Sequence, residues 1–157
     1  MKYVYLTNSP LQAMVDDEDY DRVSKYAWWL AVNGRYVLSS WKINGRYLYL
    51  HQFVMNTTER WDHKDGNGLN NCKENLRPCT HSQNLHNVGP RKGKKYKGVY
   101  WSRQNKAWLV QITKDRKWIY GGSYSTEEAA ARAYDRLAKK YHGEFAHLNF
   151  PEEGSIQ

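Results

Sequence analysis

The sequence predicts an α+β protein in which an N-terminal β-meander is followed by a three-stranded antiparallel sheet packed on one helix. Two Asn-Gly pairs, at 33–34 and 44–45, lie between alternating polar and apolar runs, the strongest short-range signal for hairpins. A glycine-, proline- and lysine-rich stretch at 88–97 lacks apolar periodicity and indicates a linker. Three short alternating runs and one amphipathic helical pattern follow this stretch.

The first half of the chain predicts short elements in close succession. Residues 2–6 alternate, and the segment from Val15 to Trp29 begins with crowded acids, which the positive end of a helix dipole stabilises. We interpret these four consecutive acids as capping residues rather than a metal site, because neighbours on a helix point in different directions. The segments expected next are strands near 28–32, 36–42 and 46–50, then a short helix over HQFVM. His51, at the start of that helix, is interpreted as structural, with a phosphate contact as the lesser alternative.

The second half predicts strands at 98–101, 107–113 and 117–124, followed by a helix. That helix is expected to begin at the capping box Ser125-Thr126-Glu127-Glu128 and to stop at Gly143. Its apolar stripe runs from Ala130 to Tyr141. A helix on one face of the sheet leaves the other face to the basic and aromatic side chains of the strands.

The net charge of +8 is concentrated in the second half of the chain. Residues 1–89 carry ten Lys/Arg against nine Asp/Glu, whereas residues 90–157 carry fourteen against seven. From Arg91 to Tyr120, ten basic residues and one acid alternate with tyrosine and tryptophan. A phosphate backbone attracts such a segment, and a solubilising face is the alternative. A membrane-surface helix is disfavoured, because the segment alternates as strands do.

The composition and the first residues argue against a membrane-spanning, a secreted or a disulfide-rich protein. No run approaches the ~18 apolar residues of a membrane span, and the first residues lack the pattern of a signal peptide. Two cysteines, Cys72 and Cys79, are too few for a disulfide scaffold and are typical of a reducing compartment. We therefore expect a cytoplasmic protein.

The segment 62–87 concentrates the residues that can perform chemistry. It contains the pair Asp62-His63, then Asn75 twelve positions after His63, then Asn84 nine positions further. On a strand, Asp62 and His63 point to opposite sides, so the carboxylate can bind a cation while the imidazole faces a water. Hard cations take oxygen ligands, and hydrolysis needs a base whose pKa lies near neutrality.

These four residues resemble the HNH nuclease motif in its ββα-metal form. The text WDHKDGNGLNNCKENLRPCTHSQN is similar to the HNH homing endonucleases of phages and mobile introns, over about residues 14–88. The resemblance implies a strand, a loop, a strand and a helix around one divalent cation, in a motif over about 61–88. It implies Asp62 and Asn84 as metal ligands, His63 as general base, and Asn75 as the brace of the loop.

One departure from the motif bears on the metal. Many members of the family have His where Asn84 stands, so the resemblance implies Mg²⁺ or Mn²⁺, one per active site, rather than zinc. His86 is a lesser alternative as ligand. A zinc site is a further alternative. The spacing of its cysteines and histidines matches no CxxC pairing, so we favour the interpretation of both cysteines as buried thiols. That alternative would use Cys72, Cys79, His81 and His86.

The segment from Tyr96 to Pro151 resembles the Apetala-two (ethylene-response-factor) DNA-binding domain, on YKGVYW, KAWLVQI, KWIYGGSYSTEEAAARAYD and LNFP. The resemblance implies a three-stranded sheet that enters the major groove of DNA. Several contact positions are Arg or Trp in the plant proteins and are not here, so the plant target sequence is not inferred. The predicted DNA-binding residues are Arg91, Lys92, Lys94, Lys95, Lys97, Tyr100, Arg103, Lys106, Gln111, Thr113, Lys117, Trp118 and Tyr120.

Together these features predict a nuclease domain at 1–88, a basic linker at 89–96, an Apetala-two-like domain at 97–151 and a tail at 152–157. We expect a metal-dependent, homing-type HNH endonuclease that nicks or cuts double-stranded DNA in a phage-infected or bacterial host cell. We expect a monomer, with a dimer as the alternative, and no membrane partner. The rival hypothesis is a DNA-binding transcriptional regulator with an inactive nuclease fold.

Overall fold

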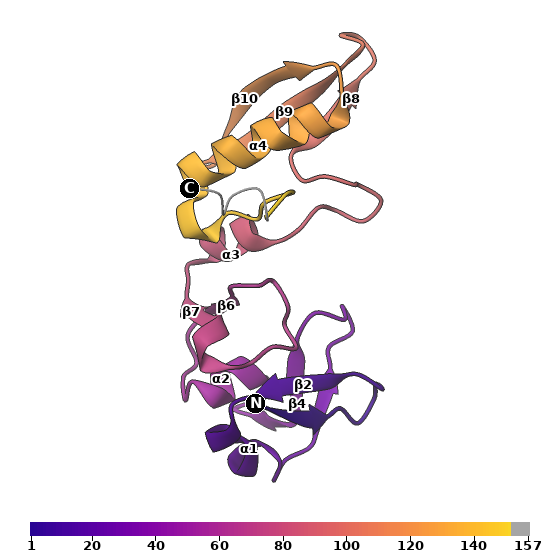
Figure 1. The fold of residues 1–157 in the computed structure, drawn as a ribbon. Coiled ribbons are helices and arrows are strands. Elements are labelled where there is room, and N and C mark those ends of the chain that lie inside the picture. The colour runs from indigo at the N-terminus through magenta and orange to yellow at the C-terminus, as the bar shows by residue number, and fades with distance from the viewer. Residues whose placement is uncertain (152–157) are drawn as a thin grey trace. The chain divides into compact units, whose positions relative to one another are not determined.

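The computed structural model describes residues 1–151, and this part of the chain is a mixed α+β protein with several small antiparallel sheets and four α-helices. The chain divides into two compact units, Met1–Asn84 and Leu85–Gln157, so the division falls inside α3 (His81–Asn87) (Figure 1). The predicted tail at 152–157 lies outside the described residues. Between residues 1 and 151, no helix has both the length and the apolar character that a membrane span requires.

The first unit is built from hairpins with short helices between them. Its first elements are β1 (Lys2–Tyr5), β2 (Gln12–Val15), α1 (Asp17–Val23), β3 (Trp28–Leu30), β4 (Val37–Ile43), β5 (Arg46–Tyr49) and α2 (Leu50–Val54). The predicted meander is confirmed, with sheet order β3-β4-β5. Asn44 and Gly45 both have positive φ, 51° and 78°, as a two-residue hairpin turn of this type requires. Strand β2, which pairs with β1, was not predicted.

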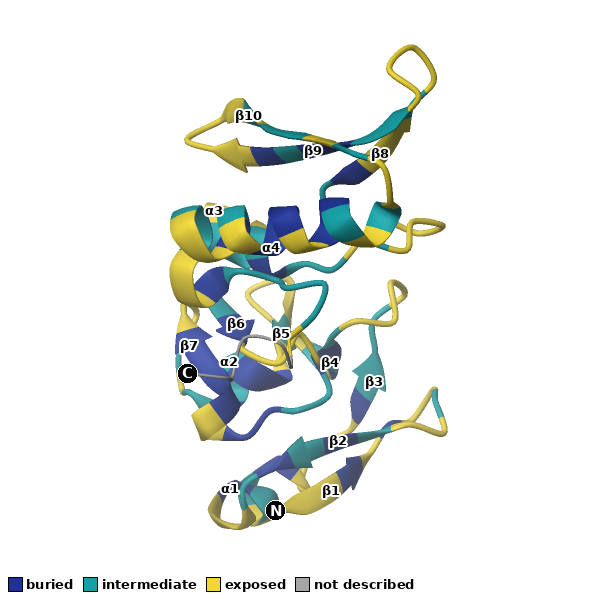
Figure 2. Cartoon of the chain, turned by 45° about the horizontal axis from the view of Figure 1, so that its top comes forward, coloured by how far each residue is buried: buried dark blue, intermediate teal, exposed yellow. Residues whose placement is uncertain are grey.

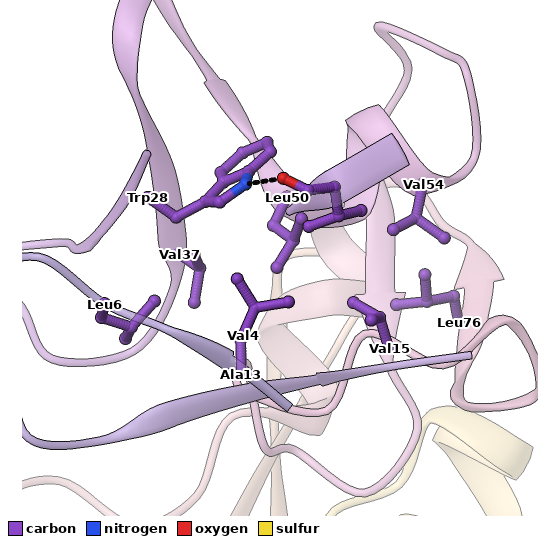
Figure 3. Close-up of a cluster of buried hydrophobic side chains, with 10 residues drawn as sticks. Val4, Leu6, Ala13, Val15, Trp28, Val37, Leu50, Val54 and Leu76 are labelled. Carbon is purple, nitrogen blue, oxygen red and sulfur yellow. Dashed lines mark hydrogen bonds between the residues drawn. The ribbon is translucent and has the colours of Figure 1, made fainter. Parts of the chain in front are cut away.

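The core of the first unit collects apolar side chains from almost every element. Trp28 is fully buried, and its indole Nε1 donates to the carbonyl oxygen of Val23 at 3.0 Å (Figure 3). Buried aromatic side chains of this kind keep a partner for the polar N–H group. The buried cluster consists of Val4, Leu6, Ala13, Val15, Val23, Trp28, Val37, Leu50, Val54 and Leu76.

The acids at the start of α1 make long-range contacts in place of a side-chain capping bond, which corrects the interpretation from sequence. Asp16 is the N-cap residue but makes no side-chain capping bond, and its Oδ2 accepts instead from the backbone N–H of Lys73 at 2.8 Å. The Lys73 ammonium group pairs with Glu18 and Asp19. The acids therefore tie α1 to the segment around Lys73, a partner that lies far along the sequence.

The second unit is a three-stranded sheet packed on one long helix, as predicted. Its strands are β8 (Val99–Ser102), β9 (Ala107–Lys114) and β10 (Lys117–Tyr124), in the order β10-β9-β8. Helix α4 (Glu127–His142) lies across one face of this sheet, with buried positions alternating with exposed ones along its length (Figures 1 and 2). The helical turn η2 (Gly143–Phe145) follows it. The second core consists of Val99, Val110, Ile112, Ala130, Ala131, Ala133, Tyr134 and Ala138.

The C-terminal end of α4 agrees with the prediction from sequence, whereas its N-terminal cap differs from the predicted one. Thr126 is the N-cap, and its side chain accepts from the backbone N–H of Ala129. A capping box requires Glu or Gln three positions after the N-cap, where Ala129 stands, so the reciprocal half of the predicted box is not formed. At the other end Gly143 has φ 56°, and the predicted glycine stop is confirmed.

Gly98 lies where the chain enters β8 against the core of the second unit. Its φ is +73°, and a Cβ atom there would lie 2.0 Å from Cδ2 of Tyr134 and 2.8 Å from the carbonyl oxygen of Gln111. Because Tyr134 is itself buried, it cannot move aside without disturbing the core. Only glycine fits this position.

We expect Gly98→Ala to lower the free energy of unfolding by about 3 kcal/mol or more, from the clash together with the left-handed backbone. Gly93→Ala is the matched control, because Gly93 has φ +80° and nothing within 4 Å of a Cβ atom. The control should lose only about 1–2 kcal/mol. Urea unfolding of the three chains measures both values, and equal losses would contradict the close approach.

Candidate functional site

The residues of the predicted site lie on a two-stranded antiparallel sheet, β6 (Trp61–His63) and β7 (Leu76–Pro78), which precedes α3. The register pairs Asp62 with Arg77 and His63 with Leu76. Since Leu76 belongs to the first core, His63 faces the core side of the sheet and Asp62 faces the other side. Along the chain, β6 is followed by a loop, the helical turn Lys73–Asn75, β7 and α3.

The loop between the two strands is closed by the side chain of Asn75, at the end of the helical turn η1 (Lys73–Asn75). Its Nδ2 donates to Asp65 Oδ1 at 2.9 Å and to the carbonyl oxygen of Asn70 at 2.8 Å. Its Oδ1 accepts from the backbone N–H of Asp65 at 3.1 Å. The side-chain amide of Asn75, a buried residue, therefore bonds to both sides of the loop.

His63 is held by an asparagine that the sequence analysis did not single out. Its Nε2 lies 3.2 Å from Oδ1 of Asn71, while Nδ2 of Asn71 donates to the carbonyl oxygen of Gly68 at 3.3 Å. That second bond turns Oδ1 toward the imidazole, so Nε2 carries the proton and donates. The lone pair is then on Nδ1. In the sequence Asn71 is one of several asparagines in a turn, and no local pattern distinguishes it.

The imidazole of His63 lies in an aromatic environment. Its ring centroid is 5.1 Å from that of His51, edge to face, and 5.8 Å from that of Tyr36, while Tyr49 stacks on His51. His51 is buried and packed among rings, which agrees with the structural interpretation of this residue.

Both histidines are neutral near pH 7. Burial lowers the pKa of His63, against the raising effects of its bond to Asn71 and of the charges on Asp65 and Asp62. Burial, and secondarily the neighbouring His63, lowers the pKa of His51 to about 3. His63 was expected to face a water, but it is 3% exposed, because its side of β6 faces the core.

Asp62 is buried opposite a buried arginine that the sequence analysis missed. The carboxylate Oδ2 accepts from Arg77 Nε at 3.0 Å and from Nη2 at 2.8 Å, and the two residues are 4% and 8% exposed. A sequence signal existed, because Arg77 lies in a short apolar strand and a buried arginine is almost always paired. The strand register, not the sequence, identifies the partner.

Asn84 lies on α3, partly buried, and its backbone N–H donates to the carbonyl oxygen of Thr80. The helix begins at a reciprocal cap, in which Gln83 N–H donates to Thr80 Oγ1 at 3.2 Å and Thr80 N–H donates to Gln83 Oε1 at 2.8 Å. This T-x-x-Q signature is present in the sequence and was overlooked. His86, the alternative ligand, stacks on His142 within the second unit.

Over residues 1–151, no group of three or more His, Cys, Asp or Glu side chains is arranged to hold a metal ion. That finding does not concern a site made from one carboxylate and the amide of Asn84. Cys72 is buried, and burial raises the pKa of its thiol to about 11, as expected for an inert structural cysteine. Cys79 is only partly buried.

The face of the second sheet opposite α4 carries five of the predicted DNA-binding residues. The register pairs Gln111 with Tyr120 and Thr113 with Trp118, and these side chains alternate with the core residues of the same strands. Trp118 is 70% exposed and Tyr120 63% exposed, an unusual display of aromatic surface. We name this face the sheet surface; it consists of Tyr100, Gln111, Thr113, Trp118 and Tyr120.

The predicted basic contacts divide into two groups. The exposed group consists of Arg91, Lys92, Lys94, Arg103, Lys106 and Lys117. The other two are bonded within the second unit. Lys95, which is also exposed, pairs with Glu128 at 2.8 Å, and Lys97 Nζ donates to the carbonyl oxygens of His86 and Val88. Lys97 thus neutralises the negative end of α3, a use that its place in a basic run did not reveal.

Comparison with known proteins found relatives of two kinds, and no family model matches the chain. A protein of Acanthamoeba polyphaga mimivirus, named uncharacterized HNH endonuclease L560, is 35% identical over 146 residues, which are 87% of this chain and 74% of that protein. The AP2-like ethylene-responsive transcription factor TOE2 of Arabidopsis thaliana is 36% identical over 86 residues, or 54% of this chain. The ethylene-responsive transcription factor ERF010 of the same plant is 46% identical over 61 residues, or 36% of this chain. The chain spans only 18% and 32% of these two plant proteins.

We expect Asn75→Ala to release the amide proton of Asp65 to solvent exchange, because that N–H loses its acceptor, Asn75 Oδ1. The backbone N–H of Lys64 donates to the backbone oxygen of residue 75 and is the internal control, since the substitution leaves that acceptor in place. Amide hydrogen exchange measured by NMR reports both sites. Unchanged protection at Asp65 would show that the side chain does not hold the loop.

Proposed function

Because the chain belongs to the HNH endonuclease family, we propose that it is a metal-dependent, homing-type endonuclease that hydrolyses a phosphodiester bond of double-stranded DNA. The observation that carries the proposal is the His63–Asn71 hydrogen bond, beside a buried carboxylate on the same strand. With this bond, the imidazole of His63 is neutral, with its proton on Nε2 and its lone pair on Nδ1. Neutral imidazole is the form in which a histidine accepts a proton.

In the proposed reaction, His63 Nδ1 accepts a proton from a water molecule as the water oxygen attacks the phosphorus. The bond from phosphorus to the 3′ oxygen breaks, and the negative charge that builds on the phosphate needs stabilisation. The bond from Nε2 to Asn71 keeps the ring in one orientation and stabilises the imidazolium that forms. Because the ring is 3% exposed, DNA and its water must reach it through a local shift of the surrounding side chains.

The donor types proposed for the site, one carboxylate and one amide oxygen, are those that hard divalent cations prefer. Asp62 would provide a carboxylate oxygen and Asn84 an amide oxygen, the ligand types that Mg²⁺ and Mn²⁺ prefer when several waters remain bound. When bound, such an ion supplies positive charge to the phosphate and to the departing oxygen. The loop brace at Asn75 holds the segment that follows both Asp62 and His63.

DNA binding is proposed to come from the second unit. The sheet surface offers flat aromatic and amide groups. Exposed cations lie nearby, at Arg103 and Lys106 on the turn before β9 and at Lys117, the first residue of β10. Phosphate contacts supply affinity and side chains on the sheet supply discrimination among bases. Similarity to two plant transcription factors supports this role. We propose that the chain acts as a monomer, which would cut one strand per binding event.

We expect His63→Ala to reduce Mg²⁺-dependent plasmid nicking by about 10²-fold or more, the usual contribution of a general base. The loss should occur with DNA affinity unchanged in a gel-shift titration, because the sheet surface is untouched. His81→Ala is the matched control, since His81 is exposed on α3. Chelation of the metal by EDTA should abolish nicking by the unmodified chain.

Nicking that survives His63→Ala would sink the assignment of the base. The second candidate function, a DNA-binding regulator with an inactive nuclease fold, is favoured by the burial of His63. It predicts DNA binding with no nicking at any Mg²⁺ or Mn²⁺ concentration. The same assay on the unmodified chain therefore separates the two functions.

We expect Lys117→Ala to weaken DNA binding and to lower the slope of log affinity against log salt by about 0.9, the value for one phosphate contact. Lys139→Ala removes the same charge from an exposed site on α4, away from the sheet surface, and should change affinity much less. Fluorescence anisotropy with a labelled duplex at several salt concentrations measures both. Equal effects would show that the chain binds DNA through net charge alone.

A further inference from the structure

The side of β6 and β7 that carries Asp62 also carries a charge of opposite sign. The register places Arg77 directly opposite Asp62, and both side chains are more than nine-tenths buried. Ionised groups so far from water must be compensated, and an arginine stays charged under all ordinary conditions. The carboxylate that would bind the metal therefore already has a cationic partner in this structure.

The geometry of the pair is specific. Nε and Nη2 of Arg77 both donate to the same carboxylate oxygen, Oδ2, at 3.0 Å and 2.8 Å. Two donors from one planar group hold that oxygen in a defined position beside the guanidinium charge. A single lysine ammonium group would supply the charge without this orientation.

A divalent ion on Asp62 would share that carboxylate with the guanidinium group. Metal–oxygen bonds of this class measure about 2.1 Å, so the two positive groups would lie within several ångströms of each other in a poorly screened interior. Like charges at such separations repel strongly where water is scarce. We propose that Arg77 sets the metal affinity of the site, holding Asp62 oriented but making the free protein bind its ion weakly. This inference rests on the proposed role of Asp62 as ligand.

A purely structural role for Arg77 has a different signature. In that case its removal would destabilise the protein and leave the affinity for metal unchanged. A role in assisting the ion would have the opposite sign, because removal would then weaken metal binding. Metal binding by the DNA-free protein separates the three cases without any measurement of activity.

The experiment is a titration of the full chain with Mn²⁺, in which electron paramagnetic resonance reports the free ion. We expect Arg77→Gln, which keeps a hydrogen-bond donor and loses the charge, to bind Mn²⁺ about tenfold more tightly or better than the unmodified chain. Arg77→Lys keeps the charge and should bind as weakly as the unmodified chain. Arg60→Met, which removes an exposed arginine just before β6, is the control for net charge and should change little.

A second measurement, of the melting temperature with and without Mn²⁺, tests the proposal even where a variant is less stable than the unmodified chain. Mn²⁺ should raise the melting temperature of Arg77→Gln more than that of the unmodified chain, since the ion replaces the missing counter-charge. Unchanged or weaker Mn²⁺ binding by Arg77→Gln, with no larger melting shift, would overturn the proposal. Asp62→Asn tests the premise separately: if that variant binds Mn²⁺ as the unmodified chain does, Asp62 is not the ligand and the proposed function fails first.

Discussion

The side chain of Asn75 is the constraint on which the rest of the site depends. It bonds to Asp65 twice and to the carbonyl oxygen of Asn70, closing the first part of the loop, residues 64–68, which has no apolar side chain; the later part is anchored by Leu69, which packs against the first core. Loops without buried apolar contacts are held by polar bonds or not at all. Because β6 and β7 are only three residues each, their register depends on the geometry of this loop. The positions of Asp62 and His63 follow from that register.

Strand alternation separates the two chemical roles proposed for β6. Asp62 turns to the side where Arg77 neutralises it, whereas His63 turns to the side of the core, where burial lowers its pKa and keeps it neutral. One residue of displacement along the strand would exchange these environments. The base and the metal ligand can thus be adjacent in sequence and still lie in electrostatic environments of opposite character.

Charge is distributed unequally between the two units, and this distribution suits the proposed division of roles. The site unit is nearly balanced, since its lysines and arginines are matched by acids such as the group around α1, which holds Lys73. The excess of positive charge lies in the second unit, in the run from Arg91 to Lys97, in the sheet and its turns, and on α4. A nuclease site without its own excess charge relies on another surface to concentrate DNA.

The sequence by itself determined the order of elements, both Asn-Gly hairpins, the helix-capping signals and the spacing of Asp62, His63, Asn75 and Asn84. These depend on turn chemistry and periodicity, which act between neighbours in the chain. Only the tertiary structure decided that Arg77 opposes Asp62, that Asn71 holds His63, and that Lys97 and Asp16 bond to backbone groups far from them. It also decided that His63 is buried. Each of these outcomes depends on strand register and on which residues meet across a fold, and no local pattern records such pairings.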